Sequence, residues 1–202
     1  MKYLFQFLLC TSIIHLNYAG SCDEFESVTR HQWKSKVFRP RAQMVLAAEN
    51  VFIHHSKEKT CWNLEECSER ARLLEYRHIK LYRFLDFGYN FMIGGDGRVY
   101  EGRGWKRFGA HTTGFNYDIG ILFLGNFDDY RPPKRMIETA KSLLECGRER
   151  GVLQPGYSVY GHRDVGCTSC PGRYLYSEIT RWRQYARAKY LAINCYAQYR
   201  IY

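Results

Sequence analysis

Short apolar runs alternate along this chain with longer stretches of helical spacing, and this alternation constrains the fold class. The apolar runs are residues 44–53, 89–93, 119–124 and 157–160. Runs of this length, bounded by glycine, asparagine or charged residues, are typical of buried strands. The stretches with helical spacing are residues 64–84, 134–150 and 174–191. Strands interleaved with helices predict an α/β fold in which helices pack on a single mixed central β-sheet.

The length and composition are those of one globular domain. A chain of 202 residues can bury a core, and no repeat, low-complexity tract or Pro/Ser-rich linker interrupts residues 28–185. With 46% apolar and 25% charged residues and five prolines, the chain is not a membrane bundle, a disordered chain or a collagen-like fibre. The glycine-rich segment 94–104 predicts a hairpin turn at Gly95-Asp96-Gly97.

The first 21 residues have the pattern of a secretory signal peptide. Lys2 is followed by an apolar stretch with no further charge before Asp23, and the stretch closes on small residues. The apolar run is interrupted by polar residues and falls short of the length that a transmembrane helix needs. We therefore expect residues 1–21 to be removed by cleavage between Ala19 and Cys22, and the mature protein to be secreted without stable membrane insertion.

Cysteine usage supports an oxidising compartment and points to a thiol with a special role. Of the eight cysteines, Cys10 leaves with the signal peptide, so seven remain. An odd number means that at least one thiol does not pair, and a metal-bound thiolate is a stable alternative. Cys61 and Cys67 close a short loop and are a natural disulfide pair. Spacing alone does not give the partners of the others.

The strongly basic balance predicts attraction to anionic surfaces. The formal net charge is +10, and removal of the signal peptide takes away one cation, Lys2. The cations are dispersed among carboxylates with no block of like charge, so we do not expect nucleic acid as the partner. A solvated basic surface is one interpretation, and affinity for the anionic polymers of a bacterial envelope is the other.

Three side chains could bind a metal at strand ends or in adjacent loops. His54 ends one apolar run, His162 follows another, and Cys170 comes eight residues later. Two imidazoles and a thiolate suit catalytic Zn²⁺, which takes three protein ligands and keeps a fourth position open. The spacing matches no standard zinc finger, and isolated histidines are often structural. His55 should point to the opposite face from His54, because adjacent residues in a strand do so.

A set of motifs in fixed order covers residues 26–183. The motifs are residues 28–30 before Trp33, 52–56, the Cys61/Cys67 pair, 86–91, 94–105, 109–112, and 161–165 followed by 170–172. Together they resemble the peptidoglycan recognition proteins, a family related to phage-type N-acetylmuramoyl-L-alanine amidases. The resemblance implies that family's fold and one domain over residues 22–183. Residues 184–202 then form a basic, tyrosine-rich C-terminal extension that either adds affinity for envelope polymers or packs on the domain.

The resemblance implies a zinc site. Carried over residue by residue, the zinc ligands are His54, His162 and Cys170, and the catalytic residues are Tyr89 and Thr168. Tyr89 would donate a hydrogen bond to the developing oxyanion, and Thr168 would position water or substrate. Members that only recognise peptidoglycan commonly have serine where Cys170 stands. Retention of Cys170 therefore favours a secreted innate-immunity zinc amidase that cleaves the bond between N-acetylmuramic acid and L-alanine.

The resemblance also suggests substrate contacts and a second disulfide. The predicted substrate-binding residues are Arg103, Trp105, Lys106, Arg107 and His111. The Lys106-Arg107 pair would favour the extra carboxylate of a diaminopimelate-type stem peptide, or is simply a pair of solvated cations. Cys22 and Cys146 resemble a pair that ties the N-terminal segment to the second long helix. Cys167 and Cys195 either pair with each other or leave Cys167 as a free thiol.

Two other functions stay open at this stage. In the first, the protein recognises peptidoglycan and muropeptides without cleaving them, or is directly antibacterial through its basic, aromatic surface. In the second, it is a zinc-stabilised secreted domain for another anionic ligand. The intact set of His54, His162, Cys170 and Tyr89 favours the enzyme over both. We expect a monomer.

Overall fold

The central element is a mixed β-sheet with six strands among the described residues. The computed structural model describes residues 20–37, 43–44 and 46–186. The strands are β1 (Ser27–Val28), β2 (Ala48–His55), β3 (Phe91–Ile93), β4 (Val99–Glu101), β5 (Ile119–Phe123) and β6 (Leu153–Gly161), in the spatial order β1-β4-β3-β5-β2-β6. Only β3 and β4 pair antiparallel, and the other neighbours are parallel. The expected fold class is confirmed.

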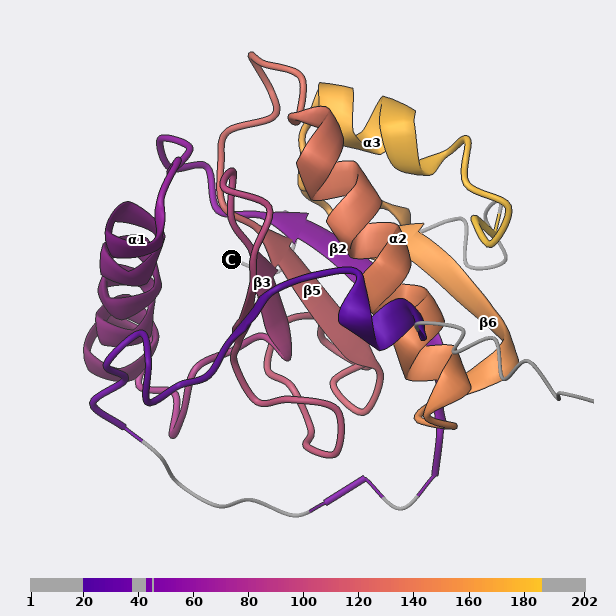
Figure 1. The fold of residues 1–202 in the computed structure, drawn as a ribbon, viewed down its shortest axis with the longest axis horizontal. Coiled ribbons are helices and arrows are strands. Elements are labelled where there is room, and N and C mark those ends of the chain that lie inside the picture. The colour runs from indigo at the N-terminus through magenta and orange to yellow at the C-terminus, as the bar shows by residue number, and fades with distance from the viewer. Residues whose placement is uncertain (1–19, 38–42, 45, 187–202) are drawn as a thin grey trace, which may run out of the picture.

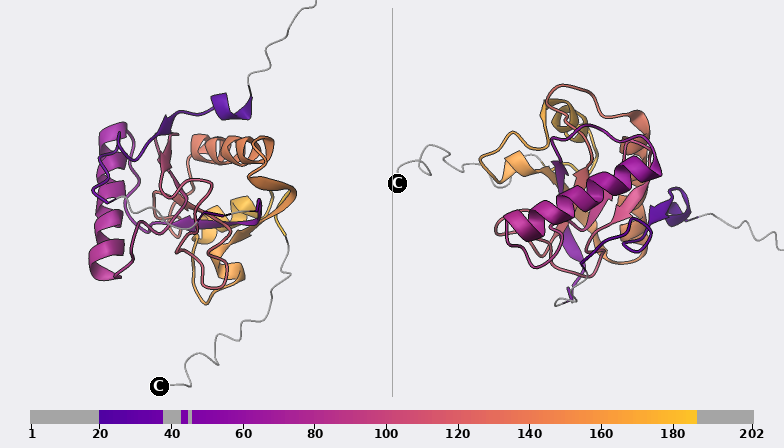
Figure 2. Two further views of the ribbon diagram at one scale, coloured as in Figure 1. Left: turned by 90° about the horizontal axis from the view of Figure 1, so that it is seen from below. Right: turned by 90° about the vertical axis from the view of Figure 1, so that its left-hand side faces the viewer.

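Helices cover both faces of this sheet. The helices are α1 (Leu64–Tyr76), α2 (Lys134–Glu149) and α3 (Arg173–Ile179), with shorter turns η1 (Ser21–Asp23), η2 (Arg77–Leu81) and η3 (His162–Asp164). Figures 1 and 2 show α1 on one side of the sheet and α2 on the other. Apolar residues of α2 and α3 pack into one core with the sheet, and residues of α1 pack into a second core on the opposite face. The sheet therefore separates two apolar layers.

The apolar pattern did not show the strands β1 and β4. β1 has two residues and β4 has three, which is too short for such a pattern, although the predicted hairpin turn implied a strand where β4 lies. The hairpin turn between β3 and β4 lies where expected: the Gly97 amide donates to the Gly94 carbonyl over 3.0 Å, and Gly97 has a φ of +84°. A glycine suits that position because other residues are strained there.

The first helix ends earlier than the spacing predicts. The helical spacing runs to residue 84, but α1 ends at Tyr76 and continues as the wider turn η2. Arg83 then has a φ of 59°, and the Phe84 amide donates back to the carbonyl of His78. Backbone in this left-handed region cannot continue a right-handed helix. The predicted helix over residues 64–84 is therefore helical to Leu81, with a wider π-helical last segment, and the prediction was wrong only for its last three residues.

The last helix is also shorter than predicted. α3 ends at Ile179, although helical spacing continues to residue 191. The Val159 amide donates to the carbonyl of Gln184, and the Ala186 amide donates to the carbonyl of Val159. Since β6 is an edge strand, its free edge offers hydrogen bonds that the chain takes up instead of continuing the helix. Residues 187–202, most of the expected extension, lie outside the described residues, as does the expected signal peptide apart from its last two residues.

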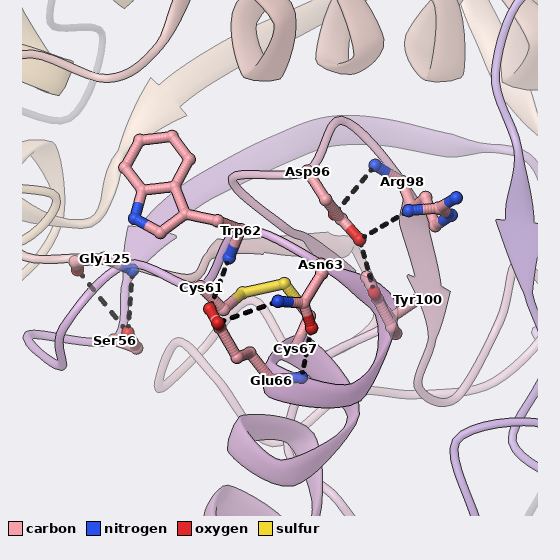
Figure 3. The surroundings of a disulfide bond; sticks show 10 residues. All are labelled: Ser56, Cys61, Trp62, Asn63, Glu66, Cys67, Asp96, Arg98, Tyr100 and Gly125. Atoms are coloured by element: carbon pink, nitrogen blue, oxygen red, sulfur yellow. Dashed lines mark hydrogen bonds and ion pairs between the residues drawn. A yellow bond between two sulfur atoms is a disulfide. The ribbon is translucent and has the colours of Figure 1, made fainter.

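Two disulfides have both cysteines among the described residues, one local and one that ties the N-terminal segment to α2. Cys61 pairs with Cys67 just before and inside α1, and Cys22 pairs with Cys146 of α2. Figure 3 shows the first of these beside the helix cap, where the Glu66 amide donates to the Asn63 side chain over 3.0 Å. Both expected pairs are thus present.

The state of Cys167 decides whether this residue is a free thiol, which the sequence left open. It is disulfide-bonded and therefore not a free thiol. Cys195 lies outside the described residues.

No helix in the described part of the chain is both long and apolar enough to span a membrane.

Candidate metal centre

The register of the central strands brings the two histidines together. Val51 and Ile53 of β2 face the core beneath α2, so His54 points to the opposite face of the sheet. Ile53 pairs with Gly161 at the end of β6, and His162 follows Gly161 directly. The ring centroids of His54 and His162 are 4.6 Å apart. Parallel pairing thus places two imidazoles that are far apart in sequence side by side.

The loop after η3 folds back and supplies the thiol. The Arg163 amide donates to the carbonyl of Cys170 over 2.8 Å, which closes the loop on η3. The sulfur of Cys170 lies 3.7 Å from Nδ1 of His54. One donor atom from each of His54, His162 and Cys170 lies within 4.8 Å of the other two. Cys170 is the free cysteine among the described residues, and it is buried.

When no cation is bound, burial keeps His54, His162 and Cys170 in their neutral forms. It lowers the pKa of His54 well below its usual range, with the neighbouring His111 and His162 adding to the effect, and it lowers the pKa of His162. Burial also raises the pKa of the Cys170 thiol to about 12. Neutral imidazoles have a lone pair to offer, and a bound dication would displace the thiol proton. The residues therefore fit a zinc ion of the His₂Cys type.

Tyr89 lies against this group. Its ring meets the His54 ring edge-on at 5.0 Å between centroids and is also packed on the rings of Phe87 and His78. Burial, and next the charge of Cys170, raise the pKa of Tyr89 above its ordinary value. Its hydroxyl therefore remains protonated at neutral pH and is available as a hydrogen-bond donor.

The side chain of Thr168 contacts the site through the backbone of Cys170. It is exposed, and its hydroxyl oxygen accepts a hydrogen bond from the Cys170 amide over 3.1 Å. This contact holds the turn that presents the sulfur. The structure thus places Thr168 two residues from the thiol, in a position to orient it.

Two further residues lie beside the candidate ligand His54. One is His111, and the other is its neighbour Thr112, which the sequence analysis missed. The His111 ring is 5.4 Å from that of His54 between centroids. Thr112 Oγ1 lies 3.2 Å from His54 Nε2 and 2.9 Å from His111 Nδ1. Thr112 stands in the motif at residues 109–112, but sequence alone does not show that its hydroxyl reaches a residue 58 positions earlier.

The side chains of Arg103 and Trp105 contact the backbone and the apolar core of the protein itself. Arg103 is 3% exposed, and its guanidinium donates to the backbone carbonyls of Phe87 and Phe108. The Trp105 ring packs on Phe91 at 4.5 Å between centroids, on the α2 side of the sheet. Neither is brought to the metal group, so a substrate contact of either residue stays a prediction.

Lys106 and Arg107 border a different hollow. With Gln43, Glu101, Trp105 and Arg150 they line a depression of about 500 Å³ beside the loop after α2. The Lys106 carbonyl accepts a hydrogen bond from the Met44 amide, which fixes the backbone of this loop. Selection of a stem peptide by these two cations also stays a prediction.

Comparison with known proteins gives the family. Residues 45–173 match the family described as N-acetylmuramoyl-L-alanine amidase. Peptidoglycan-recognition protein 2 of Holotrichia diomphalia is 38% identical over 79% of this chain and 86% of its own length. Peptidoglycan recognition protein 1 of Bos taurus is 38% identical over 87% of this chain and 93% of its own. The chain belongs to the peptidoglycan recognition protein family.

Solved structures of peptidoglycan recognition proteins share the fold. The ectodomain complex of peptidoglycan recognition proteins LCa and LCx, bound to tracheal cytotoxin, matches with a TM-score of 0.79 at 36% identity, over 80% of this chain and 99% of that one. Wild-type Drosophila peptidoglycan recognition protein LB matches with a TM-score of 0.78 at 34% identity, over 80% and 96%. The resemblance inferred from the motifs is confirmed. The amidase match includes all three candidate ligands of this peptidoglycan recognition protein.

Proposed function

We propose that this protein is a secreted zinc-dependent amidase of innate immunity that binds bacterial peptidoglycan and hydrolyses the amide bond between N-acetylmuramic acid and L-alanine. The observation that carries the proposal is the convergence of His54, His162 and the unpaired Cys170, with donor atoms within 4.8 Å of one another. A protein that only binds peptidoglycan has no chemical need for a buried free thiol between two imidazoles.

The residues have separate tasks in this reaction. His54, His162 and Cys170 would hold the ion, which when bound polarises the scissile carbonyl and lowers the pKa of water. Tyr89 donates its hydroxyl proton in a hydrogen bond to the oxygen on which negative charge develops. Loss of one such donor typically costs about 10²–10³ in rate. Thr168 holds the Cys170 amide and thereby the direction of the sulfur.

The net charge of the protein supports the proposed substrate, and its disulfides support the proposed secretion. A formal charge of +10 favours an anionic polymer such as the bacterial cell wall. One structural relative is recorded in complex with tracheal cytotoxin, which supports a muropeptide ligand here. The disulfides Cys22–Cys146 and Cys61–Cys67, together with the signal-like residues 1–21, support secretion.

The test is cleavage of purified peptidoglycan by the mature protein, followed as release of free stem peptide. We expect release with zinc supplied, and loss of release with a chelator or in a Cys170→Ser variant. A Tyr89→Phe variant should still bind zinc but release peptide about 10²–10³ times more slowly. Binding of the polymer by each variant, measured by co-sedimentation, shows that the fold is intact.

A non-catalytic function is the alternative, because the relatives quoted above are named for recognition. It would be established if the wild type sediments with peptidoglycan but releases no stem peptide with zinc present. Killing of bacteria that persists in the Cys170→Ser variant would indicate a direct antibacterial action independent of cleavage.

A further inference from the structure

A chain of buried polar groups runs from the backbone of Asp118 to the candidate metal centre. The Asp118 carbonyl oxygen lies 3.2 Å from Nε2 of His111, and Nδ1 of His111 lies 2.9 Å from Oγ1 of Thr112. The same Thr112 oxygen lies 3.2 Å from Nε2 of His54. Nδ1 of His54 then faces the sulfur of Cys170. Thr112 is 2% exposed, so water does not compete for its hydroxyl.

The backbone carbonyl of Asp118 stands at one end of this series of hydrogen bonds and fixes the donor and the acceptor in each of them. A carbonyl oxygen can only accept, so Nε2 of His111 carries the hydrogen. His111 is buried and both of its ring nitrogens face uncharged partners, so the imidazole is neutral and has only one N–H. Nδ1 of His111 must then accept the hydroxyl hydrogen of Thr112. The Thr112 oxygen in turn accepts from Nε2–H of His54, and the lone pair of His54 is left on Nδ1, which faces Cys170.

The ring in the middle of the chain cannot easily turn. A Cβ atom at Gly120 of β5 would lie 2.3 Å from Cδ2 of His111, and a Cβ at Gly109 would lie 2.2 Å from the same atom. The ring therefore occupies a slot that two glycines leave open. Tyr89 stacks on its face, with 15° between the ring planes. A ring held in this way transmits the direction set by Asp118 to Thr112.

We propose that Thr112 is a positioning residue whose hydroxyl selects the tautomer of His54 that directs the Nδ1 lone pair into the metal group. The proposal rests on the proposed metal site for its importance, but the tautomer itself is a property of the metal-free protein. Hydrogen-bond partners behind a metal-binding imidazole fix its tautomer and orientation, and their loss typically costs about 10–100-fold in metal affinity.

Zinc affinity in matched variants tests the proposal. Thr112→Val keeps the shape of the side chain and removes the hydroxyl, Thr112→Ser keeps the hydroxyl, and Thr113→Val changes the exposed neighbour. In competition with a chromophoric chelator, we expect Thr112→Val to bind Zn²⁺ about 10–100-fold more weakly. Thr112→Ser and Thr113→Val should stay close to wild type. A folded Thr112→Val protein with wild-type affinity would overturn the proposal.

The tautomer can be read directly in the metal-free wild type. Nitrogen-15 chemical shifts of the imidazoles should show His54 and His111 both protonated at Nε2. Protonation of His54 at Nδ1 would refute the proposed direction, whether or not Thr112→Val folds. If the wild type shows the expected tautomers yet binds no zinc, the metal site fails while the hydrogen-bond assignment stands.

Discussion

The ring of His111 lies where a side chain at position 120 would be, and this makes one glycine of β5 a sensitive position. In Gly120→Ala the new methyl group would meet ring carbons at 2.3 and 2.4 Å, so the ring must shift. We expect a loss of about 1–3 kcal/mol in the free energy of unfolding, measured with urea, and weaker zinc binding. Gly156→Ala in β6 is the control, because nothing lies within 4 Å of its Cβ position. Equal stability of the two variants would contradict the packing described.

His78 makes stability depend on pH. Burial, and then the charge of Arg103, lower its pKa to about 4, and its Nδ1 accepts a hydrogen bond from the Gly88 amide. Between pH 6.5 and 4 the unfolded chain therefore binds more protons than the folded one, so stability must fall as the pH falls. The contribution is present above the unfolded pKa and is lost as the pH drops toward 4.

A His78→Gln variant checks this contribution. Glutamine keeps an acceptor but does not titrate, so the fall in the free energy of unfolding between pH 7 and 4 should be smaller by up to roughly 3 kcal/mol. Urea unfolding of the zinc-free protein at several pH values measures it. Curves of equal slope for wild type and variant would show that His78 is not the titrating group.

At the level of single residues, the sequence predicts the groups that carry chemistry better than the groups that orient them. His54, His162 and Cys170 are recognisable because their residue types and motif positions are specific, and the structure brings them together. The role of Thr112 depends on how the segment before β5 lies across β2, which no local pattern encodes. For the same reason, the sequence does not show that Trp105 both packs against the core on the α2 side and borders the hollow beside Lys106, and its substrate contact stays a prediction.

Among the secondary-structure elements, the short turn η3 depends on a carboxylate that joins it to α3. Asp164 accepts a hydrogen bond from the Gly161 amide over 2.7 Å and another from the Tyr176 hydroxyl over 2.6 Å. The Tyr185 hydroxyl is a further donor at 3.2 Å. Three donors from different segments thus meet on one side chain two residues after His162. The position of His162 is therefore coupled to the packing of α3.

Asp164→Asn tests this coupling. The amide group of asparagine donates where the carboxylate accepted, so at least one of the three donors loses its partner. We expect a loss of about 1–3 kcal/mol in the free energy of unfolding and weaker zinc binding through displacement of His162. Asp129→Asn, a change at an exposed carboxylate, should leave both quantities close to wild type. The same result for both variants would show that Asp164 does not hold the turn.

The lengths of the helices show where sequence pattern stops being informative. α2 matches its predicted range to within one residue because one apolar face packs along its whole length. The spacing beyond Leu81 and Ile179 is equally helical, yet the backbone is left-handed at Arg83 in the first case and the chain joins the edge of β6 in the second. A local turn thus ends the first helix and hydrogen bonds to β6 end the last one, and neither is visible in a periodicity.

For the whole molecule, the two disulfides whose cysteines both lie among the described residues differ in the length of chain that they close. Cys22–Cys146 has a sequence separation of 124 and Cys61–Cys67 one of 6. On the chain-entropy relation these loops correspond to about 5 and about 2 kcal/mol of stabilisation. We expect the double variant Cys22→Ala/Cys146→Ala to be destabilised more than Cys61→Ala/Cys67→Ala. Urea unfolding of both under non-reducing conditions compares them, and the opposite order would rule out loop closure as the dominant effect.

The three candidate ligands are also reached at very different times during synthesis. His54 and Cys170 are 116 residues apart. The donor set therefore cannot close before Cys170 has been synthesised, however early β2 and His54 are made. A chain cut short before Cys170 would carry both histidines but lack the thiolate. It would offer two protein ligands instead of three and should bind Zn²⁺ more weakly than the protein that contains Cys170.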